Sequence, residues 1–167
     1  MFFIPTIQHT IDAWKFQKDD ILSEIEGFAE YKELPGLVAT NATTYHADQD
    51  PQKYIKFFEL ISDYIQDLDA TTVTRVWYKK YKKGDYHQVH NHGAIGWSAI
   101  FYAQYDPEEH PATVFHAPFH DHMTGGTIKH VVEAVEGDLL IFPSYLYHYV
   151  PPCQSDKERS VIAFNMI

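Results

Sequence analysis

From residue 71 to the C-terminus the chain is a run of short β-branched and aromatic stretches, each followed by a glycine- or proline-containing turn. The separators include Gly93, Pro107, Pro111, Gly137 and the pair Pro151–Pro152. Strands are predicted at Thr71–Tyr81, Tyr86–His92, Gly96–Tyr105, Ala112–Ala117, Thr127–Val135, Asp138–Phe142, Tyr147–Val150 and Ser160–Ile167. Short strands at such regular spacing are typical of a barrel or a two-sheet jelly roll, so we expect a mainly β fold.

The first 70 residues have a different pattern. Apolar residues recur at about every 3.6 positions over residues 10–29 and again over residues 51–68. Pro51 stands where a first helical turn favours proline. We therefore expect one domain spanning residues 1–167, in which an N-terminal helical support (residues 1–70) packs on a jelly-roll core (residues 71–167).

The composition excludes several classes of protein. A formal net charge of −10 leaves no basic footprint for nucleic acid. The one lysine cluster, Lys79, Lys80, Lys82 and Lys83, is interpreted as a solvated strand edge. Cys153 is the only cysteine and lies in an expected loop, so a reducing, cytoplasmic location is predicted. No signal peptide and no membrane span are expected.

Eleven histidines are many for this length, and three of them stand close together. On a strand, His90 and His92 point to the same face, which suits two adjacent positions on a metal ion. His87 has the opposite parity and is expected to face outward. His148 lies in an apolar setting and would need a partner if buried, so it is the predicted third ligand. The spacing also suits zinc, nickel or copper, and does not identify the metal.

Two further groups have alternative interpretations. His116, His120, Asp121 and His122 are interpreted as a solvated loop, although they could line a site entrance. Arg159 either binds an anion from inside the barrel or lies exposed and paired with Glu158 or Asp156. The predicted histidine site favours the first alternative, because a guanidinium binds a carboxylate through two parallel hydrogen bonds.

Several segments resemble the prolyl-4-hydroxylase-like 2-oxoglutarate/iron(II) oxygenases. The most specific is Gly137–Pro151 (GDLLIFPSYLYHYVP), which is similar to the family segment that carries the distal iron ligand. Three more segments resemble neighbouring family strands: Tyr81–His92 (YKKGDYHQVHNH), Trp97–Tyr102 (WSAIFY) and Arg159–Asn165 (RSVIAFN). By pattern the chain is most similar to the members found in bacteriophages and marine bacteria.

The resemblance implies a double-stranded β-helix of the cupin-like kind. It implies Fe(II) on His90, His92 and His148, and 2-oxoglutarate with its distal carboxylate on Arg159. Tyr102 matches a position that in relatives hydrogen-bonds that carboxylate, Tyr81 is a further expected cosubstrate-binding residue, and ascorbate would be an accessory reductant. Two departures stand out. First, His92 stands where the family has an acidic ligand, and Asn91 is expected to face away from the metal site. Second, Val161 stands where the family has a serine two residues after Arg159.

The expected activity is hydroxylation of a small-molecule or peptide substrate, for example at a peptidyl proline, with conversion of 2-oxoglutarate to succinate. Two alternatives remain open from sequence: a three-histidine cupin-like metalloenzyme that uses no 2-oxoglutarate, and a non-catalytic jelly-roll binding module. Trp77, Tyr86 and Trp97 are candidates for the pocket wall or for the core. The sequence does not predict an oligomeric state.

Overall fold

The structure is a computed structural model that describes residues 5–33, 39–40, 42–46, 49–70 and 72–167. The helices are α1 (Trp14–Phe28) and α2 (Ile55–Ile65), and a 3-10 turn at Pro51–Tyr54 leads into α2. The strands in these residues are β1 (Ile7–Thr10), β2 (Lys32–Glu33), β3 (Ala39–Thr40), β4 (Ala42–Thr43), β5 (Val73–Tyr81), β6 (Tyr86–His90), β7 (Trp97–Gln104), β8 (Val114–His120), β9 (Thr127–Val131), β10 (Asp138–Pro143), β11 (His148–Val150) and β12 (Arg159–Met166). None of the described helices is long and apolar enough to cross a bilayer.

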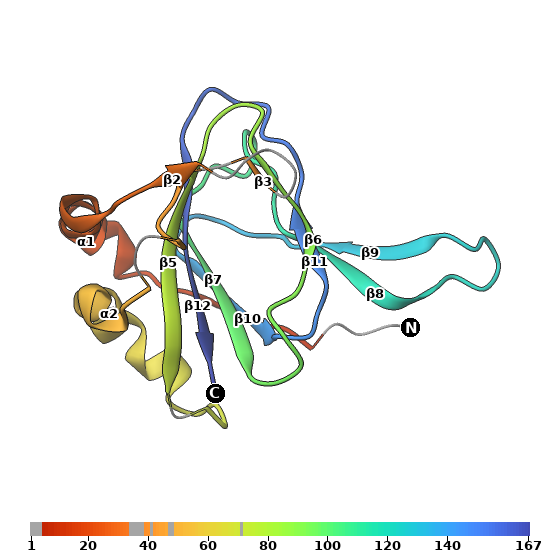
Figure 1. Cartoon of the computed structure of the whole chain (residues 1–167), viewed down its shortest axis with the longest axis horizontal. Helices are drawn as coiled ribbons and strands as arrows, with labels where there is room; N and C mark the ends of the chain where they lie inside the picture. Colours follow the sequence, from red (N-terminus) through yellow and green to blue (C-terminus); the bar gives the residue numbers. More distant parts are fainter. Residues whose placement is uncertain (1–4, 34–38, 41, 47–48, 71) are drawn as a thin grey trace.

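The strands form two antiparallel sheets. The large sheet has the order β1-β10-β7-β12-β5-β4-β2, and the small sheet has the order β3-β6-β11-β8-β9. Figure 1 shows both helices beside the large sheet, while the β8–β9 hairpin extends away from the body of the molecule. This mainly β arrangement with two helices matches the expected fold class.

The large sheet has apolar side chains on both faces. Its outer face is covered by the helices, and its inner face meets the small sheet. Strand alternation sends Phe101 and Phe164 to this outer side, where the Phe57 ring of α2 lies 5.1 Å from Phe101 and 6.0 Å from Phe164. Trp14 of α1 is 2% exposed, and its indole N–H donates to the Ala103 carbonyl at 3.0 Å. Each large apolar side chain buried in this way stabilises the fold by about 1.5–3 kcal/mol.

The opposite face of the large sheet meets the small sheet in a second core. Ile100, Phe142 and Val161 from the large sheet pack with Phe115 and Val150 from the small one. Polar groups interrupt this apolar layer between the sheets, and they form the candidate site described below.

The predicted elements are largely present, with shifted ends. Residues 7–10 form β1 and pair with β10, so α1 begins at Trp14 and not near residue 10. β8 extends to His120, so His116 and His120 lie on a strand paired with β9, contrary to the predicted loop; Asp121 and His122 follow the strand. The short strands β1 to β4 have no period long enough to be predicted. Thr71 lies outside the described residues.

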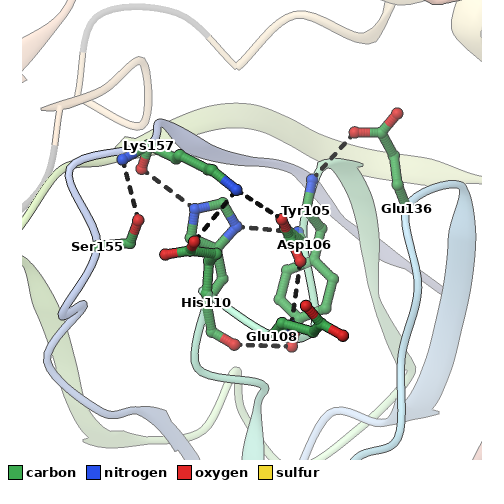
Figure 2. A network of polar contacts seen from close by, with 8 residues as sticks. Tyr105, Asp106, Glu108, His110, Glu136, Ser155 and Lys157 are labelled. Carbon is green, nitrogen blue, oxygen red and sulfur yellow. Dashed lines mark hydrogen bonds and ion pairs between the residues drawn. The ribbon is translucent and has the colours of Figure 1, made fainter.

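A polar network fixes the chain that leads into β12 (Figure 2). His110, 6% exposed, accepts the Asp106 backbone N–H at its Nδ1 (3.0 Å), and its Nε2 donates to the Lys157 carbonyl (3.1 Å). The Lys157 ammonium pairs with Asp106 and Glu109 at 3.0 and 3.2 Å. His110 is therefore buried, and it holds the Lys157 segment two residues before Arg159.

Candidate active site

Three imidazoles converge on the inner side of the small sheet. His90 ends β6 and His148 begins β11, and the two residues are direct cross-strand partners. His92 follows β6, and its backbone N–H donates to the Ser144 carbonyl at 2.9 Å. One ligand nitrogen from each of His90, His92 and His148 lies within 4.8 Å of the others. These are the three histidines that the sequence predicted to share one ion.

Hydrogen bonds orient two of the rings. His90 Nδ1 lies 2.9 Å from the Gln88 carbonyl, and His148 Nδ1 lies 3.0 Å from the Leu146 carbonyl. A carbonyl accepts only, so each Nδ1 carries the proton and each Nε2 keeps a free lone pair. Such backbone contacts fix the tautomer of metal-binding histidines. The His92 ring is stacked between Trp77 and His148, at 5.5 and 5.2 Å between ring centroids.

The rings are held in the neutral form that coordinates metals. Burial, and then the positive charge of Lys79, lower the pKa of His90 to about 4. Burial and the neighbouring His90 lower the pKa of His92 to about 3. Burial likewise lowers the pKa of His148 well below its ordinary value. No proton has to leave these nitrogens at neutral pH before a cation binds.

The prediction that His87 faces outward is wrong. The register of β6 against β11 shifts between the pairs His148–His90 and Val150–His87, so two residues of β6 lie opposite the single residue Tyr149 of β11. This bulge reverses the parity and brings the His87 ring onto His90, with 3.8 Å between centroids. The ring lies beside the three converging histidines, and burial lowers its pKa.

Arg159 lies on the facing sheet and is 1% exposed. Its Nε, Nη1 and Nη2 have no hydrogen-bond partner among the described residues. The acidic residues that could have paired with an exposed Arg159 contact lysines instead: Glu158 lies 3.5 Å from Lys80 and Asp156 lies 3.1 Å from Lys83. A buried unpaired cation costs several kcal/mol, so this arrangement points to an anionic ligand.

Aromatic side chains surround the guanidinium. Its carbon lies 4.6 Å from the Tyr81 ring centre and 5.8 Å from the rings of Tyr102 and Tyr105. Tyr102 donates its hydroxyl hydrogen to Thr113 Oγ1 at 2.9 Å. Burial raises the pKa of Tyr81 to about 12, so the phenol beside Arg159 stays neutral and does not serve as its counterion.

Lys79 is buried, contrary to its interpretation as part of a solvated edge. β5 is an interior strand of the large sheet, so consecutive lysines on it point to opposite faces. Lys79 points toward the histidines, whereas Lys80 pairs with Glu26 and Glu158 on the other face. Lys79 Nζ lies 2.9 Å from His87 Nδ1. Burial, and then the charge of Arg159, lower the pKa of Lys79 to about 7. Lys79 lies two residues before Tyr81 on the same strand, so the two side chains share one face. This spacing is the sequence signal that could have identified Lys79 as a site residue.

Two cavities meet at the histidines. The inner cavity extends between the sheets from His148 to Arg159, past Thr113 and Tyr81. The outer cavity, about 500 Å³, is lined by Arg75, Tyr45 and Asn91. Five side chains line both: Trp77, Lys79, His87, His90 and His92. Trp77 is thus a wall residue, whereas Trp97 packs against the core under the helices.

Two facing sheets, three clustered histidines that could hold a metal ion and two cavities that share these histidines together suggest the class of protein. Residues 75–165 match the model of a family described as "Putative 2OG-Fe(II) oxygenase". The chain belongs to this 2-oxoglutarate/iron(II) oxygenase family, and its relationship to the prolyl-4-hydroxylases is as expected from the sequence. No curated protein sequence matches the chain significantly.

Solved structures share the fold at low sequence identity. A Pseudomonas putida prolyl-4-hydroxylase is 15% identical with a TM-score of 0.67, over 96% of this chain and 91% of that one. HygX from Streptomyces hygroscopicus, with nickel, 2-oxoglutarate and hygromycin B bound, is 12% identical with a TM-score of 0.70, over 98% and 82%. A Trichoplax adhaerens prolyl hydroxylase in complex with a peptide fragment is 14% identical with a TM-score of 0.63, over 96% and 83%.

Proposed function

We propose that this protein is an Fe(II)- and 2-oxoglutarate-dependent oxygenase that hydroxylates its substrate. His90, His92 and His148 hold the iron, Arg159 binds the distal carboxylate of 2-oxoglutarate, and Tyr81 and Tyr102 line the cosubstrate pocket. The two facing sheets then correspond to a double-stranded β-helix, with α1 and α2 as its support. The observation that carries the proposal is the buried, unpartnered guanidinium at the far end of the cavity that begins at the histidines.

The residues present fit both groups. Three neutral imidazoles, two of which have their Nε2 lone pairs left free by the backbone contacts of Nδ1, are a donor set for iron, and they leave coordination positions open. With no acidic ligand among them, the ion keeps its full positive charge. This charge and that of Arg159 lie at opposite ends of one cavity, which suits a dianion with a carboxylate at each end. The cosubstrate in the neighbour HygX is such a dianion.

The chain's own contribution is orientation and the exclusion of water. When bound, iron and 2-oxoglutarate would supply the oxidising chemistry together with O2: 2-oxoglutarate loses CO2, one oxygen atom of O2 enters succinate and the other enters the C–H bond of the substrate. The Gln88 and Leu146 carbonyls hold two ligand rings, and Trp77 and His148 hold the third by stacking. The rings of Phe115 and Phe142 are fully buried, and their centroids lie 5.7 and 4.8 Å from that of the His148 ring. They exclude water from this side of the site.

The substrate reaches the iron through the outer cavity. Its volume, about 500 Å³, suits a small molecule or one residue of a peptide. The Trichoplax neighbour was solved in complex with a peptide fragment and HygX with hygromycin B bound, so a peptide and a small molecule are both candidates, with a peptidyl proline among them. Ascorbate would serve as an accessory reductant.

The test measures 2-oxoglutarate binding and turnover separately. Purified protein is loaded anaerobically with Fe(II), and 2-oxoglutarate affinity is determined by calorimetry; succinate formation is then followed after O2 is admitted. We expect metal-dependent binding and at least slow uncoupled succinate formation. Arg159→Gln should lose 2-oxoglutarate binding and keep iron, whereas His130→Ala, on the exposed strand β9, should keep both.

The same measurements separate the alternatives. Iron binding without 2-oxoglutarate binding would replace the proposal with a cupin-like three-histidine metalloenzyme. Absence of both would indicate a non-catalytic jelly-roll module.

A further inference from the structure

The outer cavity is built on one face of β5. Arg75, Trp77 and Lys79 occupy alternate positions of this strand, and all three line the cavity. Tyr81, the next residue of the same parity, lies beside Arg159 in the inner cavity. One strand therefore presents a row of side chains that runs from the exposed Arg75 inward past the histidines.

Each of these three side chains is a hydrogen-bond donor, and none has an anionic partner among the residues that the structure describes. Arg75 has one described polar contact, from Nη1 to the Tyr45 hydroxyl at 3.4 Å. The Trp77 indole nitrogen is buried with no acceptor among the described residues. Lys79 contacts His87, a neutral base.

The described lining of the outer cavity contains no aspartate or glutamate. This is unusual for a chain with a net charge of −10, in which Lys18, Lys56, Lys80, Lys83 and Lys157 all lie within ion-pair distance of carboxylates. The charged side chains of the described lining, Arg75 and Lys79, are therefore basic within an acidic protein, and a cleft lined by positive charge concentrates anions at its entrance.

We propose that the outer cavity selects a substrate bearing a negatively charged oxygen group, a carboxylate or a phosphate, which Arg75 binds with help from the Trp77 indole N–H. The guanidinium provides paired donors for such a group. Tyr45 and Trp77 meet edge to face with 5.1 Å between ring centroids and supply an apolar wall for the rest of the substrate. This inference names a substrate class and rests on the proposed function.

The experiment uses zinc(II)-loaded protein with and without 2-oxoglutarate, and three probes of similar size: phenylacetate, phenyl phosphate and the neutral phenylacetamide. Binding is measured by saturation-transfer NMR. We expect at least one anion to bind ten-fold or more tightly than the amide. Arg75→Gln should bring that ratio close to one, Arg75→Lys should restore part of it, and Lys129→Gln on β9 should leave it unchanged. The ratio between the two anions identifies carboxylate or phosphate as the preferred group.

Equal affinity for anions and amide, or an anion preference that survives in Arg75→Gln, would overturn the inference. Because Arg75 is exposed on its strand, the variant should fold, and circular dichroism verifies this. A failure of the proposed function is seen separately, as absence of 2-oxoglutarate binding in the wild-type protein; the probe ratios are read independently of that result.

Discussion

Arg159 and Tyr81 are direct cross-strand partners on β12 and β5, and the guanidinium carbon of Arg159 lies 4.6 Å from the centre of the Tyr81 ring. The ring shields one side of the cation from water without neutralising it. The charge is therefore held in place and left available to a ligand, and this arrangement determines several measurable properties of the protein.

Arg159→Gln should weaken 2-oxoglutarate binding by roughly 30-fold or more, because a charge-assisted pair is worth about 2–5 kcal/mol. In the wild-type protein 2-oxoglutarate should raise the unfolding temperature, since a ligand that binds only the folded state stabilises it. In Arg159→Gln that increase should vanish. Thermal unfolding at several 2-oxoglutarate concentrations checks both points, and an equal increase in the variant would contradict the assignment of Arg159.

His148→Ala should weaken metal binding by at least about 100-fold, because one of three ligands is lost from a site whose other two rings keep their positions. The matched control is His130→Ala, which removes an exposed imidazole from β9. Equilibrium titration with Zn(II) or Ni(II) against a competing chelator gives the affinities. Equal metal affinity in the two variants would rule out the three-histidine centre.

Metal affinity should be nearly constant between about pH 7.5 and pH 5. The pKa values of His90 and His92 are lowered to about 4 and about 3, so both ligands are already neutral over this range and protons do not compete with the metal. Chelator titrations at three pH values test this. An affinity that falls about ten-fold per ligand for each pH unit below 6.5 would show that these histidines titrate normally.

The same lowered pKa values affect the stability of the metal-free protein. Between pH 6.5 and about 3 the unfolded chain binds protons on these histidines that the folded chain does not, so the free energy of unfolding should decrease as the pH falls through this range. Above pH 6.5 this contribution is fully present. Urea unfolding at pH 7.5 and pH 5.5 with a chelator present measures the difference, and stability that increases on acidification would contradict it.

His110→Ala should lower the free energy of unfolding by about 1–3 kcal/mol, because it removes two part-buried hydrogen bonds, to the Asp106 backbone N–H and to the Lys157 carbonyl. It should also weaken 2-oxoglutarate binding, since the Lys157 segment that leads into Arg159 loses its anchor. Denaturant unfolding and calorimetry measure the two effects. His122→Ala, on the exposed hairpin turn, serves as control and should change neither.

The sequence by itself determined the features that depend on local pattern. Turn residues and β-rich stretches delimit most of the strands predicted after residue 70 within one or two residues. Strand alternation predicted that His90 and His92 share one face, and the two rings do lie together, although β6 ends at His90 and His92 follows it. The apolar surroundings of His148 indicated that it needed a partner, and the predicted histidine site favoured an anion-binding role for Arg159. The resemblance of Gly137–Pro151 identified the family.

The tertiary structure decided what depends on how distant segments pair. The bulge between β6 and β11 turned His87 inward, which parity within one strand could not reveal because the extra residue is defined only against the partner strand. The interior place of β5 buried Lys79, although its sequence resembles an edge. The two facing sheets placed an unpaired guanidinium across a cavity from three neutral imidazoles, because the electrostatic environment of a side chain is set by the neighbours that folding brings to it.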